Sequence, residues 1–309
     1  LLRLYHLLII DCNMIPIDSR IFNSLTHELK RHISGVEDTV KITRAMQMIA
    51  TSKLYRAKEK CENSYRYLKE LRNILAAVET EDAVREHPFL RPRKEGKTAL
   101  FVVAGDKGLC GDFNHRILDF ADAFIAEHDV SKVFALGQET REHYEKKGIP
   151  LSNFYIHMAQ EPHAFDAISV ANDMLEMFSS GEYKEVYIVY TRTPAPSAQE
   201  PTAKKLLPVL LPEKAENGTG RAAVSDAVFE PRTREALDNF LSQYVMAEIY
   251  SALADSAMAI HFKRMTSMRQ STENGEELMG ELTAKYNHQR QESITGELIN
   301  ASAAALRGE

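Results

Sequence analysis

The stretch of this sequence that comes nearest to a chemical site is a glycine-rich turn, Gly105 to Gly111 (GDKGLCG), directly after a predicted buried strand. Turns of this kind bind phosphate through free backbone amides, and the spacing of their glycines is diagnostic. A dinucleotide site needs G-x-G-x-x-G, whereas here the spacing is G-x-x-G-x-x-G, and no Lys-Ser or Lys-Thr follows Gly111 as in a P-loop. We therefore interpret Gly105, Gly108 and Gly111 as parts of a tight structural turn and expect no cofactor.

Other reactive side chains show no arrangement typical of catalysis. Neither G-x-S-x-G nor H-E-x-x-H occurs, and the histidines and carboxylates lack metal-ligand spacing, so we expect no catalytic residue and no metal site. Cys12, Cys61 and Cys110 are widely spaced without CxxC, which argues against zinc or a disulfide framework. Cys110 could be a nucleophile, but its place beside an apolar strand favours a buried structural thiol. His261 and His288 are expected at a surface or an interface.

Positive charge is concentrated on one predicted helix, although the 309-residue chain is acidic overall, with a formal net charge of −6. The overall balance gives no reason to expect nucleic acid or an anionic membrane surface, and no apolar run approaches the ~20 residues of a membrane span. The cluster indicates either a contact surface for an acidic partner or a solvated helix face. Its members are Lys41, Arg44, Lys53, Arg56, Lys58 and Lys60.

Two long helices are predicted to carry most of these residues. The segment from about Thr233 to Leu306 has no proline, and as one helix it would be roughly 100 Å long at ~1.5 Å per residue. A domain of this size cannot bury such a helix along its whole length. The apolar residues recur at steps of three, four or their sums, which is typical of a coiled-coil seam. They are Leu237, Leu241, Tyr244, Ala252, Ala257, Met265, Met268, Leu278, Leu282, Tyr286, Ile294, Leu298, Ala301 and Ala305.

The partner helix is predicted between Pro16 and Pro88, where the same periodicity runs from Ile21 to Leu75. We expect residues near Leu25 to Leu75 to pack against those near Leu237 to Tyr286, in an antiparallel or staggered coiled coil. The second helix is expected to project beyond the first.

Between the helices the pattern predicts an α/β domain. The expected order is a strand at 98–104, a helix at 114–128, a strand at 132–136, helices at 138–147 and 164–179, and a strand at 186–190. This βαβα order predicts an open, largely parallel sheet with helices on its faces. Residues 206–211 are expected as an edge strand, and Pro194, Pro196, Pro201, Asn217, Gly218 and Gly220 as parts of irregular loops.

The expected domains are therefore an N-terminal extension at 1–20, a coiled-coil helix at 21–85, an α/β domain at 96–230 and a coiled-coil helix at 232–306. The first twenty residues are expected to be a bland extension, with a leftover targeting segment as the alternative. Because the chain begins with Leu1 rather than Met, we expect processing or trimming before this position.

Three blocks of the sequence resemble the gamma subunit family of F-type ATP synthases. They are Lys41 to Lys53 (KITRAMQMIATSK), Gly105 to Asn114 (GDKGLCGDFN) and Glu281 to Ala304 (ELTAKYNHQRQESITGELINASAA). The blocks occur in family order, and the resemblance covers roughly Phe22 to Leu306. It implies an antiparallel coiled coil of the two termini with an inserted Rossmann-like α/β domain that binds no nucleotide.

The resemblance also implies a non-catalytic rotor shaft, which couples proton-driven rotation of a membrane ring to ATP synthesis in the surrounding subunits. The implied partners are the alpha and beta subunits of the F1 ring, the delta and epsilon subunits of the central stalk and the c-ring of the membrane sector. By the same resemblance, contact with the catalytic subunits falls to Arg44, Met46, Lys53, Arg290, Gln291 and Thr295. The run from Ala301 to Leu306 is expected to sit in an apolar sleeve.

Ala259 to Met265 (AIHFKRM) departs from the small, Ser-Glu-rich run usual in the family, so local contacts there are expected to differ. The redox-cysteine insertion of the chloroplast form is absent. The start of the chain then favours the mitochondrial inner membrane, matrix side, with the cytoplasmic side of a bacterial plasma membrane as the alternative. Two rival functions remain: a coiled-coil scaffold with an inserted α/β domain, and an oxidoreductase with helical dimerisation arms, which would need a phosphate-binding loop.

Overall fold

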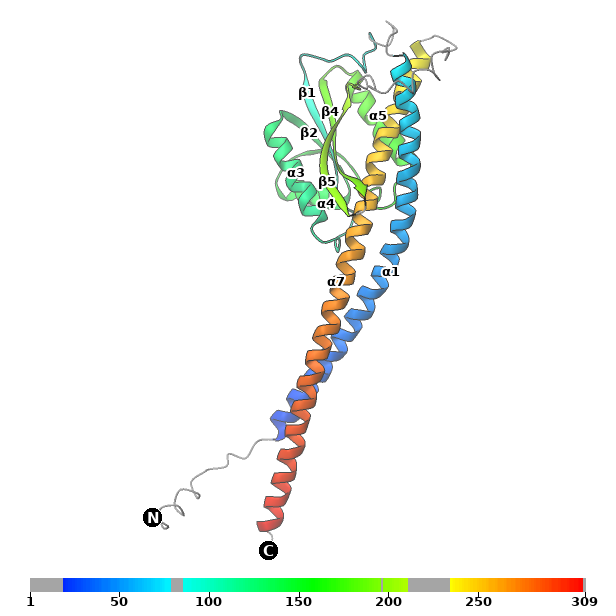
Figure 1. The fold of residues 1–309 in the computed structure, drawn as a ribbon. Coiled ribbons are helices and arrows are strands. Elements are labelled where there is room, and N and C mark those ends of the chain that lie inside the picture. Colours follow the sequence, from blue (N-terminus) through cyan, green and yellow to red (C-terminus); the bar gives the residue numbers. More distant parts are fainter. Residues whose placement is uncertain (1–18, 79–85, 196, 211–233, 308–309) are drawn as a thin grey trace, which may run out of the picture. The chain divides into compact units, whose positions relative to one another are not determined.

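The computed structural model describes residues 19–78, 86–195, 197–210 and 234–307 (Figure 1). Its two longest elements are helices α1 (Ser19–Val78) and α7 (Arg234–Arg307), of 60 and 74 residues. Both helices are continuous, as the absence of proline predicted. Residues 1–18 of the extension expected at 1–20, and the expected loop residues Pro196, Asn217, Gly218 and Gly220, lie outside the described residues.

The described residues between α1 and α7 form a five-stranded sheet with three helices. The elements are β1 (Lys97–Val103), α3 (Phe113–Glu127), β2 (Val130–Leu136), α4 (Gln138–Lys146), β3 (Leu151–Tyr155), α5 (Ala164–Ser179), β4 (Tyr183–Ala195) and β5 (Ala198–Leu207). The strand order is β3-β2-β1-β4-β5. β1 pairs in parallel with β2 and β4, β2 pairs in parallel with β3, and only β4 and β5 are antiparallel. The predicted fold class, two long helices with an inserted α/β domain, is confirmed.

Helices cover both faces of this sheet. Figure 1 shows α3 and α4 on one side and α5 and α7 on the other. Right-handed crossovers require this placement of α3, α4 and α5. The connections through α3 and α4 run from β1 to β2 and on to β3, in one direction along the sheet. The connection through α5 runs in the opposite direction, from β3 past β1 to β4. β1 is consequently buried from Thr98 to Val103, and the ring of Phe101 stacks on Phe134 of β2 at a centroid distance of 4.3 Å.

Three strands differ from the expectation. β3 was not predicted, β4 begins earlier and ends later than 186–190, and β5 covers 198–207 instead of 206–211. Pro194 and Pro201, expected in irregular loops, lie inside β4 and β5. Pro201 fits there because β5 is an edge strand, where a missing backbone N–H breaks no ladder on its outer side.

The contacts divide the chain into two compact units, one of residues 46–267 and one of residues 1–45 and 268–309. In the first unit the adjoining parts of α1 and α7 share one hydrophobic core with the sheet. Leu68 and Leu75 of α1 and Leu241 and Leu253 of α7 belong to this core and are almost fully buried. The first unit is therefore held together as a sheet packed on a helix pair.

In the second unit α1 and α7 pair alone and antiparallel. The hydroxyl oxygens of Thr43 and Thr272 lie 2.8 Å apart, and Val40 faces Gly275 one turn further along. Arg44 forms an ion pair with Glu276 beside this contact. Figure 1 shows α7 continuing past the start of α1, as predicted.

Several apolar residues expected on the α7 seam are exposed instead. Leu278, Ile294 and Leu298 are 40%, 46% and 65% exposed, whereas Thr272 is buried and Gly275 half-buried. The side chains facing α1 follow the strict alternation of three and four steps that a coiled coil requires. Residues 278, 294 and 298 fall outside that alternation, so the expectation was wrong for them.

Within the described ranges no helix combines the length and the apolar character needed to cross a membrane. Those ranges also contain no group of three or more His, Cys, Asp or Glu side chains placed to hold a metal ion.

Candidate functional site

The glycine turn after β1 is held by contacts within the protein. The backbone N–H of Gly105 donates to Oδ1 of Asn114, at the start of α3, over 2.9 Å. A Cβ at position 105 would lie 2.9 Å from the same oxygen. The carbonyl of Gly105 accepts from the N–H of Glu139 over 3.0 Å. The backbone N–H of Gly105, the group that a phosphate would need, is therefore already bonded.

The other two glycines of the turn, Gly111 and Gly108, differ in whether the structure requires a glycine at their position. Gly111 has a φ of +60°, in the left-handed region that other residues rarely adopt. Gly108 has an ordinary φ, and the nearest atom to an added Cβ would be Oε1 of Glu139 at 3.9 Å. The steric argument for glycine thus holds at 105 and 111, while nothing in the structure requires glycine at 108.

Arg264 of α7 binds the outer side of this turn. Its guanidinium donates to the carbonyl of Lys107 over 3.2 Å, to that of Gly108 over 3.4 Å and to Oε1 of Gln160 over 3.2 Å. In doubly wound sheets, cofactors bind outside the carboxyl ends of the strands where the strand order reverses, here between β1 and β4. Part of that position is taken by an arginine that belongs to the chain itself.

Residues 259–265 of α7, whose sequence AIHFKRM differs from the run usual in the gamma subunit family, contact the loops around them. Nε2 of His261 donates to the carbonyl of Gln160 over 2.8 Å, and Lys263 forms an ion pair with Asp112 at 2.8 Å. The hydrogen bond from Lys263 holds the pKa of Asp112 below its usual value. Burial lowers the pKa of His261 to about 4, so the imidazole is neutral near pH 7. These contacts attach the 105–112 and 160–162 loops to α7.

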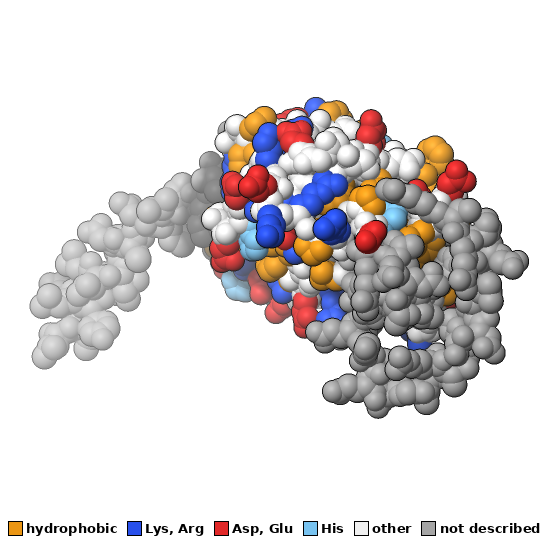
Figure 2. All heavy atoms as spheres, turned by 90° about the horizontal axis from the view of Figure 1, so that it is seen from above, with side chains coloured by type: hydrophobic (Ala, Val, Ile, Leu, Met, Phe, Trp, Pro, Cys, Tyr) orange, Lys and Arg blue, Asp and Glu red, His pale blue; other side chains and the backbone are white. Residues whose placement is uncertain are grey.

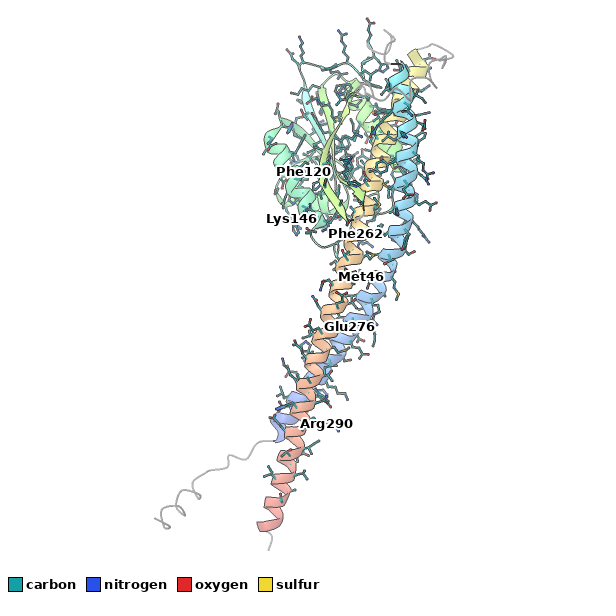
Figure 3. The ribbon with its side chains drawn as sticks, viewed as in Figure 1. Met46, Phe120, Lys146, Phe262, Glu276 and Arg290 are labelled. Carbon is teal, nitrogen blue, oxygen red and sulfur yellow. The ribbon has the colours of Figure 1, made fainter. Side chains whose placement is uncertain are left out.

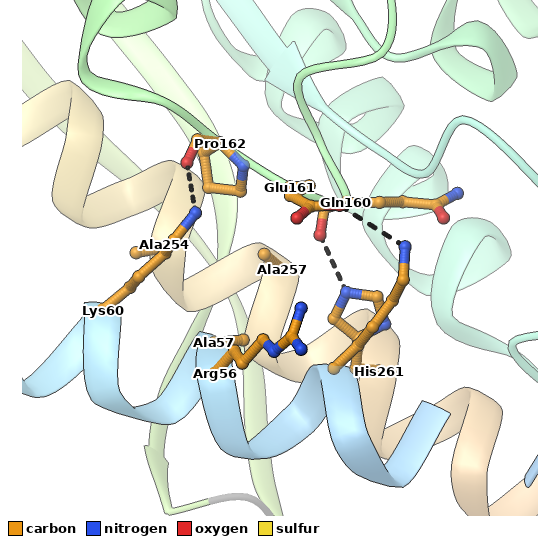
Figure 4. Close-up of a pocket in the computed structure, with 10 residues that line it drawn as sticks. Arg56, Ala57, Lys60, Gln160, Glu161, Pro162, Ala254, Ala257 and His261 are labelled. Atoms are coloured by element: carbon orange, nitrogen blue, oxygen red, sulfur yellow. Dashed lines mark hydrogen bonds and ion pairs between the residues drawn. The ribbon is translucent and has the colours of Figure 1, made fainter. Parts of the chain in front are cut away.

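A small cavity of about 40 Å³ lies between α1, α7 and the 160–162 loop (Figure 4). Lys60 donates to the carbonyl of Pro162 over 3.0 Å, and Lys53 lies 3.4 Å from a carboxylate oxygen of Glu161. The space is enough for about one water molecule and too small for a nucleotide. This cavity belongs to the attachment of the loop.

The basic residues of α1 are largely paired. In the unit of residues 1–45 and 268–309, Lys41 pairs with Glu37 and Asp38, and Arg44 with Glu276. In the other unit, Lys53 pairs with Glu161, and Lys58 lies 3.8 Å from Glu62. The expected concentration of free positive charge is therefore smaller than the sequence indicated. Because these pairs are solvent-exposed, each is weak and can exchange with an external carboxylate.

The six residues expected to contact catalytic subunits lie on α1 and α7, in both units of the chain. Met46 is half-buried on α1, while Arg44 and Lys53 keep 52% and 42% of their side chains exposed. Arg290 and Gln291 are exposed on α7, and Figure 3 shows Arg290 far along this helix from Glu276. The hydroxyl of Thr295 donates to the carbonyl of Gln291 within the helix over 2.9 Å.

The sequence did not predict a network of buried charged side chains around two carboxylates of α7. The carboxylate of Glu248 on α7 accepts from Arg72 over 3.0 Å, from the hydroxyl of Tyr244 over 2.8 Å and from Lys204 of β5. One heptad further along, Asp255 accepts from the hydroxyl of Tyr65 over 2.6 Å and from the thiol of Cys61 over 3.0 Å. The available signal was a pair of acidic residues seven positions apart on the face of α7 that the apolar seam occupies.

Charges of both signs occur on the face of the molecule seen in Figure 2. Figure 2 shows blue, red and orange side chains interspersed over the face turned to the viewer.

Cys110 is buried, and burial raises the pKa of its thiol, which fits the expected structural role.

Comparison with known proteins agrees with this geometry. Residues 25–306 match the ATP synthase family. The ATP synthase gamma chain of Ralstonia nicotianae is 32% identical over 288 residues, which cover 91% of this chain and 99% of the relative. The gamma chain of Solibacter usitatus is 33% identical, with coverage of 91% and 98%. The rotor of the Euglena gracilis mitochondrial ATP synthase has the same fold, with a TM-score of 0.63, 15% identity and coverage of 88% and 99%. The chain belongs to the gamma chain family of ATP synthases.

Proposed function

We propose that this protein is the central rotor shaft of an F-type ATP synthase and that it has no catalytic residues of its own. The observation that carries the proposal is the family match over residues 25–306, together with the two continuous helices that this range contains. Its proposed partners are the alpha and beta subunits of the F1 ring, the delta and epsilon subunits of the stalk and the c-ring.

Long paired helices suit this task because bending them would disrupt many backbone hydrogen bonds at once. A rotor drives synthesis only if it binds the conformations of the catalytic subunits with different affinities, since equal affinity shifts no equilibrium. An asymmetric helical surface is sufficient for that. Catalytic groups on the shaft itself are not needed.

We propose that Arg44, Met46 and Lys53 contact acidic loops of the catalytic subunits. The exposed ion pairs of Arg44 with Glu276 and of Lys53 with Glu161 support this, because their partners can be exchanged for external carboxylates at little cost. On this proposal the positive charges are held in place by weak internal partners until the ring presents its own.

We propose that the α/β domain binds no nucleotide and instead contacts other rotor subunits. The bond from the Gly105 N–H to Asn114 supports this because it uses a backbone donor that a phosphate would need. Isothermal calorimetry with ATP and NAD on the chain tests it. Saturable binding that is lost on substitution of Gly105 would overturn this part of the proposal.

The protein is part of a membrane-associated complex, and two compartments were expected for it. The bacterial relatives quoted above are 32% and 33% identical, whereas the mitochondrial rotor is 15% identical. We therefore propose the cytoplasmic side of a bacterial plasma membrane, the second of those compartments. Recovery of the native complex from a mitochondrial fraction would refute this location.

Native purification tests the rotor proposal as a whole. We expect the chain to migrate in a large complex that hydrolyses ATP, and removal of the chain to abolish the coupling of hydrolysis to proton transport. Purification as a separate assembly without nucleotide-binding subunits would support a coiled-coil scaffold instead.

We propose that Arg290, Gln291 and Thr295 form a contact with a catalytic-subunit loop that is made and broken in each turn. Positions 291 and 295 share a helix face, and Arg290 beside them is free to form a charge-assisted hydrogen bond. Such a bond must be modest, on the order of 1–3 kcal/mol. In reconstituted vesicles, Arg290→Ala or Gln291→Ala should lower ATP synthesis more than deletion of residues 307–309, which the apolar sleeve tolerates. Equally mild effects would remove this assignment.

A further inference from the structure

A second cavity, of about 520 Å³, lies in the unit of residues 46–267, between α1, α7 and the strands β4 and β5. It is separate from the glycine turn and from the surfaces assigned to the ring. Its volume falls in the range of roughly 300–1,000 Å³ that is typical of small-molecule sites. Tyr65 and Tyr190 form part of its wall.

Positive charge predominates in the lining of this cavity. Arg72, Arg192 and Lys204 face it, and Glu248 is the only carboxylate among its lining residues. The oxygens of Glu248 are already engaged by Arg72, Lys204 and Tyr244. Burial alone would raise the pKa of Glu248, but the two cations outweigh it and hold the pKa below the usual value. Glu248 is thus ionised near pH 7 and offsets one of the three positive charges.

The three cations retain unused hydrogen-bond donors. A guanidinium carries five N–H donors and an ammonium three, of which Arg72 and Lys204 each direct one at Glu248. Arg192 is exposed on β4 and forms no salt bridge with any residue in the described part of the chain. A ligand could therefore bind these groups without breaking the bonds to Glu248.

A second acidic residue, Asp255, is not part of the cavity lining. It is 1% exposed, and its carboxylate accepts hydrogen bonds from Tyr65 and Cys61. Burial raises the pKa of Asp255. Even with Glu248 and Asp255 both ionised, the three cations of the lining leave a surplus of positive charge.

We propose that this cavity binds a small, multiply charged oxyanion, with Arg192 as the principal ligand and Arg72 and Lys204 as supporting cations. Arginine suits phosphate and carboxylate groups because its planar fork donates two parallel hydrogen bonds. The two hydroxyl-bearing rings, Tyr65 and Tyr190, line the same space and suit the uncharged part of an organic anion.

Isothermal calorimetry on the full chain at low salt tests the proposal, with inorganic phosphate, pyrophosphate and citrate as probes. We expect saturable one-site binding of at least one probe, and a weakening of at least tenfold in Arg192→Ala. Arg56→Ala is the matched control, because Arg56 is also an exposed arginine of the same unit and lines the small cavity of Figure 4 but not this one. Preference for pyrophosphate would assign a phosphate ligand, and preference for citrate a polycarboxylate. Failure of all three probes to bind, or equal weakening by both arginine variants, would overturn the proposal.

A second variant should change the affinity for the probe in the opposite direction. Glu248→Gln removes the only carboxylate of the lining with little change of shape, so it should tighten binding of the same probe by severalfold. A thermal melt followed by circular dichroism verifies that the variant is folded. Unchanged or weaker binding by a folded Glu248→Gln protein would contradict the electrostatic reasoning, and if this variant does not fold, the Arg192→Ala measurement decides alone.

Discussion

The close approach of α1 and α7 at Gly275 gives a prediction whose sign can be worked out. Val40 is buried against this glycine, and a Cβ at position 275 would lie 2.6 Å from Cγ2 of Val40. That distance is too short for two carbon atoms, so one side chain or one helix must move. Valine in a helix has one strongly preferred χ1 rotamer and cannot easily turn away.

Two opposing terms determine the effect of Gly275→Ala. Replacing glycine by alanine inside a helix stabilises the helix by ~1 kcal/mol. Forcing an extra carbon into a packed contact costs ~1–3 kcal/mol. Gly280 provides the matched control, since it lies in the same helix and an added Cβ there would have no atom within 4 Å. We therefore expect Gly280→Ala to stabilise the helix pair by ~1 kcal/mol and Gly275→Ala to be ~1–3 kcal/mol less favourable than that.

Amide hydrogen exchange of residues 268–285 measures this difference, because it reports the free energy of local opening of the helix pair rather than that of the whole chain. In the double variant Val40→Ala/Gly275→Ala the clash is removed, so the two substitutions should show a favourable coupling of ~1 kcal/mol or more. If Gly275→Ala slowed exchange as much as Gly280→Ala, the inferred steric contact would be refuted.

Three further predictions concern the unit of residues 46–267. Burial lowers the pKa of His261 from 6.5 to about 4, so its contribution to the free energy of unfolding is complete above about pH 6.5. As the pH drops from 6.5 toward 4, the free energy of unfolding should fall by up to ~1.4 kcal/mol per pH unit. Denaturant melts at several pH values should show a smaller dependence on pH in His261→Gln. Arg264→Met removes the donors to Lys107, Gly108 and Gln160, so it should cost ~1–3 kcal/mol and speed exchange in the 105–111 turn, whereas the exposed Arg56→Met should do neither. Burial raises the pKa of the Cys61 thiol, so mass spectrometry should find Cys61 unmodified by a thiol reagent until denaturant is added; modification in the native protein would contradict its buried bond to Asp255.

The long helices and the parallel strands were predictable because each follows from a pattern within one segment. Absence of proline defined α1 and α7, and continuous apolar runs defined β1 and β2. β3 (LSNFY) has no such run, since it pairs on one side only and three of its five side chains are exposed. The extent of β4 and β5 was missed because prolines were interpreted as loop residues. Pro201 is tolerated because β5 is an edge strand, and Pro194 lies where the register between β4 and β5 shifts.

The contacts between distant segments were harder to predict. Arg264 binds the turn at Lys107 and Gly108, 157 and 156 positions away, and no local pattern carries that information. The partners of Glu248 come from α1 and β5, so the buried charge becomes acceptable only when three elements meet. A reading of α7 by itself would have placed an apolar residue there.

The apolar residues at the end of α7 were assigned to the wrong surface for a related reason. Counting them on a single period assumes that all of them face one partner, yet Ile294 and Leu298 are 46% and 65% exposed. The alternation of three and four steps continues instead at Gln289, Ser293 and Gly296, which are all half-buried. The apolar residues thus belong to an outer surface rather than to the pairing with α1. An apolar outer surface is costly in water and is typical of an interface with another protein. On the proposed function that interface is with the surrounding ring, which explains why the helix is apolar where it has no partner within its own chain.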